Sequence, residues 1–120
     1  MTDIKTTPDI GTLRAAIERR DADGVLAWYA PDAVLTVLDR DHPPAAPLVF
    51  TGLEQIGAYY RDVCARNITH QVRDAVITPG GLAYTQHCRY PDGLAVVCAT
   101  VATTGAGKIR TQTAIQVWDS

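Results

Sequence analysis

The second half of the chain alternates apolar and polar residues, and this period-two pattern constrains the fold more than any other feature. Three turn-forming segments interrupt it, namely Pro79-Gly80-Gly81, Pro91-Asp92-Gly93 and Gly105-Ala106-Gly107. Such alternation is typical of strands with one buried face, and Pro, Asp and Gly in these orders favour tight turns. The pattern predicts four consecutive antiparallel strands, over residues 68–77, 82–90, 95–103 and 108–118.

The first part of the chain has helical spacing instead. The segment Thr7-Pro8-Asp9 is typical of a helix start, and apolar residues then recur at helical intervals as far as Arg20. Asp23 is a candidate cap for a second helix, which Pro31 would end because its ring cannot continue a helix.

Two short strands and a third helix connect these halves. Residues 34–38 are rich in β-branched side chains and predict a strand, whereas residues 39–47 carry three prolines and predict a loop. Residues 48–50 predict another short strand. Thr51 and Glu54 then have the spacing of a capping box at the start of the third helix.

This order of elements, helices first and an antiparallel meander after them, indicates an α+β fold with helices on one sheet face. The 120 residues suit one domain, over residues 1–120. A net charge of −2 without a basic cluster argues against nucleic acid and anionic membranes as partners. No apolar run is long enough to span a membrane, and the N-terminus lacks a leader pattern, so we expect a cytoplasmic protein.

Motifs for cofactors and metals are missing from the sequence. It contains no GxGxxG, Walker, HExxH or GxSxG pattern. The three histidines, His42, His70 and His87, lie on different predicted elements. The three cysteines lack a CxxC pair, which favours free thiols in a reducing compartment over the alternative, a disulfide between Cys88 and Cys98 across a hairpin. We therefore expect no cofactor and no metal.

Three stretches of the sequence resemble the nuclear transport factor 2-like superfamily. They are YAPDAVL (29–35), FTGLEQIGAYYRDV (50–63) and the last strands, with GKI (107–109) before a closing Trp118. Small bacterial members include ketosteroid isomerases, limonene epoxide hydrolases and SnoaL-like polyketide cyclases. The resemblance implies a cystatin-like cone, in which three helices pack on a curved, mostly antiparallel sheet around an apolar cavity. It also implies a homodimer formed through the outer face of the sheet.

The positions that carry chemistry in these relatives are changed here. The resemblance places the tyrosine, the base and the second aspartate of a ketosteroid isomerase at Leu13, Val37 and Ala99, which are all apolar. An epoxide hydrolase needs an Asp-Arg-Asp set, but the adjacent residues Arg73-Asp74 would point to opposite faces of a strand. The cyclases use an aspartate from a late strand, and the late strands here hold none before Asp119.

The same alignment gives a set of residues that face the cavity from the helices, the first strand and the last strand. They are Trp28 or Tyr29, Val37, Tyr60, Gln112, Ala114, Gln116 and Trp118.

The inward face of the middle hairpin has two solutions. The turn at Pro91-Asp92-Gly93 places the even-numbered residues of both strands on one face, whereas alignment through Gly107 turns Val97, Ala99 and Val101 inward. A bulge would reconcile the two. We favour the even-numbered face, because the odd-numbered face would bury the side chains of His87 and Arg89 together. Its cavity residues are then Tyr84, Gln86 and Cys88.

Two functions fit this predicted fold and this set of cavity residues. In the first, the protein binds an apolar polyketide-, steroid- or terpene-like molecule and is a cofactor-independent isomerase, cyclase or dehydratase. Asp39, which shares a strand face with Val37, would be the base, and Tyr60 or Tyr84 a hydrogen-bond donor. In the second, Asp39 is a solvated strand end, and the protein is a non-catalytic ligand-binding or dimeric accessory module. A cavity above about 300 Å³ with a polar base favours ligand binding. A cavity filled by Trp28, Tyr60 and Trp118 favours the module.

Overall fold

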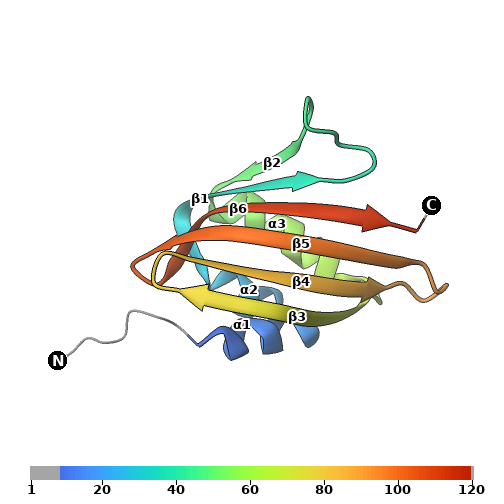
Figure 1. The fold of residues 1–120 in the computed structure, drawn as a ribbon, viewed down its shortest axis with the longest axis horizontal. Coiled ribbons are helices and arrows are strands. Elements are labelled where there is room, and N and C mark those ends of the chain that lie inside the picture. Colours follow the sequence, from blue (N-terminus) through green and yellow to red (C-terminus); the bar gives the residue numbers. More distant parts are fainter. Residues whose placement is uncertain (1–8, 120) are drawn as a thin grey trace.

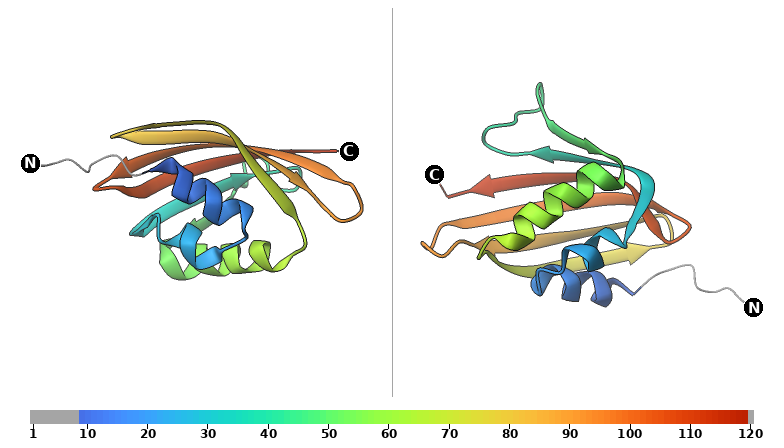
Figure 2. Two further views of the ribbon diagram at one scale, coloured as in Figure 1. Left: turned by 90° about the horizontal axis from the view of Figure 1, so that it is seen from below. Right: turned by 180° about the vertical axis from the view of Figure 1, so that it is seen from behind.

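A computed structural model describes residues 9–119 and has the α+β architecture that the sequence predicts. Three helices cover one face of a curved six-stranded sheet, and the other face of the sheet is open (Figures 1 and 2). The helices are α1 (Ile10–Glu18), α2 (Ala22–Leu26) and α3 (Gly52–Ala65). The strands are β1 (Tyr29–Leu38), β2 (Leu48–Thr51), β3 (Thr69–Thr78), β4 (Gly81–Arg89), β5 (Ala95–Gly105) and β6 (Lys108–Trp118).

The sheet runs in the order β2-β1-β6-β5-β4-β3, so the last strand of the chain lies beside the first. All neighbours are antiparallel except β1 and β6, which are parallel. The β3-to-β6 meander confirms the four predicted strands to within two residues at each end. In the turn before β6, Ala106 and Gly107 both have positive φ, which matches the twist of a tight hairpin.

The start of the chain differs from the sequence prediction at two points. Asp21, not Asp23, caps α2, because its side chain accepts the backbone N–H of Gly24 at 3.1 Å. Pro31 does not end a helix. It lies within β1, where the pairing with β6 is irregular between Tyr29 and Val34, so its missing N–H breaks no regular ladder. The cap proposed at Thr7 lies outside the described residues; within them, Asp9 caps α1 through the N–H of Gly11.

The third helix begins directly at the end of β2. Gly52 has φ +84°, which lets the backbone turn from strand to helix without a loop. The predicted capping box is wrong, since the Thr51 side chain makes no cap bond. Gln55, one residue beyond Glu54, reaches back instead, and its Oε1 accepts the N–H of Thr51 at 2.8 Å.

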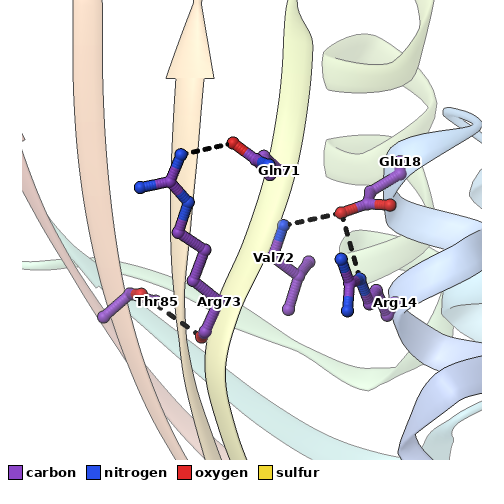
Figure 3. A network of polar contacts seen from close by, with 6 residues as sticks. All are labelled: Arg14, Glu18, Gln71, Val72, Arg73 and Thr85. Atoms are coloured by element: carbon purple, nitrogen blue, oxygen red, sulfur yellow. Dashed lines mark hydrogen bonds and ion pairs between the residues drawn. The ribbon is translucent and has the colours of Figure 1, made fainter.

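A hydrogen bond to the Glu18 carboxylate of α1 holds the edge strand β3. Glu18 Oε2 accepts the backbone N–H of Val72 at 2.9 Å and an N–H of Arg14 at 3.3 Å (Figure 3). This satisfies a donor that an edge strand would otherwise expose. A bulge follows at Asp74, where φ is +56° and the Thr85 hydroxyl bonds the carboxylate at 2.8 Å.

The core lies between the helices and the concave face of the sheet. Its most deeply buried side chains are Leu13, Leu35, Val37, Ile56 and Ile109. The outer face of β5 and β6 is apolar but exposed, with Val101 and Val117 both about two-thirds accessible. None of the helices in residues 9–119 is both long and apolar enough to cross a membrane.

Candidate functional site: a cavity between the third helix and the sheet

A cavity of about 230 Å³ opens between α3 and the concave face of the sheet. Side chains of β1, β4, β5, β6 and α3 line it, because the inward positions of these strands face a helix that does not fill the space. Its volume is below the roughly 300 Å³ at which drug-sized pockets begin. Its walls combine apolar side chains, such as Leu35 and Val96, with polar and charged ones, which include Gln112, Asp62 and Arg66.

Four hydrogen-bonded side chains form a polar floor, which is the name used below for Tyr60, Tyr29, Gln112 and Thr100. The hydroxyl oxygens of Tyr60 and Tyr29 are 2.7 Å apart. Tyr29 donates to Gln112 Oε1, and Gln112 Nε2 donates to Thr100 Oγ1 at 3.4 Å. Gln112 and Thr100 are 4% and 3% exposed, so the network satisfies polar atoms that burial would otherwise penalise.

The buried tyrosines of the cavity are neutral. Burial raises the pKa of Tyr29 and of Tyr60 well above the ordinary value, and the neighbouring tyrosines add to the effect. Burial also raises the pKa of Tyr84, which stands on β4 against the same floor. Near neutral pH these hydroxyls keep their protons and can act as hydrogen-bond donors without becoming charged.

The mouth of the cavity carries a carboxylate. Asp39 Oδ1 accepts the N–H of Asp41 at 2.9 Å and lies 2.8 Å from His42 Nδ1. Burial by itself favours the neutral acid, but the bonds from His42 and from the Asp41 N–H outweigh it and hold the pKa of Asp39 below its ordinary value. Asp39 is therefore ionised, and within the described residues its Oδ2 makes no hydrogen bond.

Aromatic rings frame this mouth. The rings of Tyr90 and Trp118 lie 5.8 Å apart, and the guanidinium of Arg40 sits 4.5 Å above the Trp118 ring. On the helix side, Tyr59 packs against Phe50 at 4.7 Å. A rim of this kind offers flat apolar surfaces to a ring-shaped ligand.

One flank of the cavity contains a thiol beside an imidazole. Cys88 Sγ lies 3.2 Å from His70 Nδ1, and Gln86 Nε2 lies 3.0 Å from the same nitrogen. Burial raises the pKa of Cys88 to about 11, and burial together with Arg20 lowers the pKa of His70. The pair is thus a neutral thiol and a neutral imidazole, not a thiolate–imidazolium pair.

Most of the residues proposed from the sequence come together here. Those that line the cavity are Val37, Asp39, Tyr60, Tyr84, Gln86, Cys88, Gln112, Ala114, Gln116 and Trp118. Two do not. Tyr29 lies behind Tyr60 and touches it through the hydroxyl. Trp28 packs in the core near α1 and α2, and its carbonyl accepts the N–H of Ile109 at 2.7 Å.

The face of the middle hairpin is also settled. Tyr84 pairs with Thr100 and Cys88 with Val96, without a bulge, so the even-numbered residues face the cavity. The alternative that turned Val97, Ala99 and Val101 inward is wrong, since all three are exposed on the outer face. Register through the short turn fixes the face, because a shift of one residue would exchange both sides of the strand.

The residues of the site that were not predicted from the sequence include Tyr59 and His42, and also Asp62 and Arg66, which line the cavity. Tyr59 lines the cavity next to Tyr60, although only one of the two was expected there. His42 is the partner of Asp39. Its signal was available in the spacing, because an aspartate three residues before a histidine, at the start of a proline-rich loop, suits a tight side-chain-capped turn.

The fold and the site together define a small α+β protein of the cystatin-like type, with a small open cavity between its curved sheet and its third helix. The chain belongs to the SnoaL-like domain family, whose model matches residues 11–118. No protein of curated description matches the chain.

Several solved structures share this fold. An NTF2-like protein from Mesorhizobium loti superposes on 92% of this chain and 88% of its own, with TM-score 0.75 and 10% identity. A protein with a cystatin-like fold from Silicibacter pomeroyi covers 92% and 74%, with TM-score 0.71 and 15% identity. A protein of ketosteroid isomerase-like fold from Catenulispora acidiphila covers 90% and 85%, with TM-score 0.64 and 22% identity. At these identities the likeness establishes the fold and not the reaction.

Proposed function

We propose that the protein binds an apolar, ring-containing small molecule with one oxygen function and transfers a proton on it without a cofactor. The observation that carries this proposal is the pairing within one cavity of an ionised carboxylate, Asp39, with neutral tyrosine hydroxyls. Asp39 is the general base, acting through Oδ2, and Tyr60 or Tyr84 bonds the substrate oxygen.

The lining of the cavity supports this substrate class. Apolar residues and an aromatic rim suit the body of a polyketide-, steroid- or terpene-like molecule, and the polar floor suits a single carbonyl or hydroxyl group. A base beside the carbon and a donor at the oxygen are the two groups that α-proton abstraction needs. Isomerisation, aldol-type cyclisation and dehydration of a carbonyl compound can each begin with that step.

A second candidate is a non-catalytic binding module. Leu13 and Val37, which occupy the positions aligned with the isomerase tyrosine and base, are each only 1% exposed and belong to the core. The cavity is also small, and the bonds that lower the pKa of Asp39 make it a weaker base. In this case the protein would hold its ligand without changing it.

Hydrogen–deuterium exchange separates the two candidates. 2-Tetralone is an apolar bicyclic ketone, and NMR in deuterated buffer follows the loss of its α-protons. We expect exchange above the buffer rate with the native protein and at least about a hundredfold less with Asp39→Asn, the lower end of typical general-base contributions. Asp41→Asn is the matched control, since it removes a carboxylate from the same loop but contributes only its backbone N–H to the site. Equal exchange rates in native protein and Asp39→Asn would refute the catalytic role.

We also propose that the protein forms a homodimer through the outer face of the sheet. On β5 and β6 this face carries eight uncharged side chains: Val97, Ala99, Val101, Thr103, Thr111, Thr113, Ile115 and Val117. An uncharged surface of this kind can pack against its own copy without like-charge repulsion. Light scattering should give twice the chain mass for the native protein and the single mass for Val101→Lys. A native protein that is monomeric at tens of micromolar would contradict the proposal.

A further inference from the structure

The polar floor joins four elements of the fold through one continuous chain of hydrogen bonds. Thr100 comes from β5, Gln112 from β6, Tyr29 from β1 and Tyr60 from α3. Gln112 stands at the centre, and it is the one member whose two ends differ, because its Oε1 only accepts and its Nε2 only donates. The direction of every proton in the chain therefore depends on how this amide is turned.

In the orientation that the structure has, the order of protons is fully determined. Tyr29 has one proton and donates it to Gln112 Oε1, which can only accept. The bond of 2.7 Å between the two tyrosines must then be donated by Tyr60. The Tyr60 oxygen consequently offers only a lone pair to the cavity, and it can bind a ligand hydroxyl but not a ligand carbonyl.

Rotating the amide by 180° exchanges its oxygen and nitrogen and reverses the whole chain. Thr100 then donates to Gln112 Oε1, Gln112 Nε2 donates to Tyr29, and Tyr29 donates to Tyr60. The three hydrogen bonds of the chain are all kept, because a hydroxyl can both give and accept a hydrogen bond. The Tyr60 proton becomes free, and the same residue can now donate to a ligand carbonyl.

We infer that Gln112 is a specificity-determining residue that lets the polar floor bind one oxygen either as a hydroxyl or as a carbonyl. The ligand class that this suits is a compound whose oxygen alternates between ketone and enol, so that both forms are held at the same place. The inference rests on the proposed function in one respect: it requires a ligand whose oxygen reaches Tyr60 from the cavity, which Tyr60 lines.

The test compares two bicyclic probes of similar shape, 2-naphthol and 2-tetralone, with naphthalene as the reference that lacks oxygen. A naphthol hydroxyl can donate or accept, whereas the tetralone carbonyl only accepts. We expect both to bind the native protein more tightly than naphthalene by calorimetry. Tyr60→Phe should remove this preference for both probes.

Gln112→Glu fixes one direction of the chain. At about pH 9, where the introduced carboxyl is ionised, both of its oxygens accept, so Tyr29 must donate to it and Tyr60 must donate to Tyr29. The affinity for 2-tetralone relative to 2-naphthol should fall at least about tenfold, the cost of an unpaired buried carbonyl. A ratio within threefold of the native value would overturn the inference.

Tyr29→Phe makes the inference testable even if the buried carboxylate prevents folding. Without Tyr29 the Tyr60 proton has no internal acceptor and is free for the ligand, so the ratio should shift at least threefold toward 2-tetralone. An unchanged ratio, or a shift toward 2-naphthol, would overturn it.

The failure of the inference can be told from the failure of the proposed function. If Asp39→Asn loses α-proton exchange while Gln112→Glu and Tyr29→Phe leave the ratio of the 2-tetralone and 2-naphthol affinities unchanged, the inference is refuted but the proposed function stands. If none of the probes binds the native protein, the proposed function fails and the inference fails with it.

Discussion

Removing the hydroxyl of Tyr29 tests whether the polar floor stabilises the fold as well as shaping the cavity. Tyr29 is 4% exposed and makes two hydrogen bonds, one with Tyr60 and one with Gln112. Each bond between neutral groups contributes roughly 0.5–1.5 kcal/mol, and Gln112 Oε1 would be left buried without its donor. Tyr29→Phe should therefore lower the free energy of unfolding by about 2 kcal/mol. For a domain of this size that corresponds to a fall in Tm of roughly 6–12 °C.

The matched control is Tyr59→Phe. Tyr59 also lines the cavity, but its hydroxyl makes no hydrogen bond within residues 9–119, so this variant should lie within about 0.5 kcal/mol of the native protein. Urea unfolding followed by tryptophan fluorescence measures both variants, and equal m-values would show that the unfolded states are comparable. The reasoning is refuted if the two variants lose the same stability, since the network would then contribute nothing beyond ring burial.

Three further predictions concern other parts of the molecule. Because the folded pKa of Asp39 lies below its unfolded value, its stabilisation is present above about pH 4 and is lost as the pH falls through the folded pKa. Asp39→Asn should thus destabilise the protein at neutral pH, with a difference that disappears in acid unfolding experiments; a difference that persists in acid would contradict this. Glu18→Gln should weaken the hydrogen bond between the Glu18 side chain and the Val72 N–H, and so reduce the protection of the Val72 amide in hydrogen exchange by up to about tenfold. Arg14→Ala removes only an exposed ion pair and should leave this protection unchanged. Burial raises the pKa of the Cys88 thiol to about 11, so at about pH 8 it should react with iodoacetamide at least tenfold more slowly in the folded protein than in urea. Peptide mass spectrometry measures both rates, and equal rates would show that burial does not protect the thiol.

The sequence determined much of the sheet. Alternation between polar and apolar residues, with turn residues at regular intervals, is a local property, and it predicted the meander from β3 to β6. The turn at Pro91-Asp92-Gly93 also indicated the inward face of β4 and β5, because a short turn fixes which residues stand opposite each other. The proline-rich segment after Asp39 was correctly predicted to be a loop.

Predictions that depended on helix ends were less successful. Asp21 and Asp23 are both good caps by composition, and only the packing of α2 decided between them. Pro31 is a helix breaker by its chemistry, yet it is accommodated in β1 at a point where the ladder is irregular. Trp28 or Tyr29 was expected to face the cavity, but Trp28 lies in the turn just before β1, and its indole packs elsewhere in the core.

Only the tertiary structure decided the composition of the site. The contact between Tyr29 and Gln112 joins residues 83 positions apart, and it exists because β1 lies parallel to β6, a pairing that no local pattern predicts. The partner of Asp39 and the order of protons in the polar floor likewise follow from distances between side chains. The sequence determined by itself which residues alternate and where the chain turns, since those depend on neighbours along the chain. Hydrogen bonds and burial across the cavity depend on neighbours in space, and these arise only when the sheet has curved around its helices.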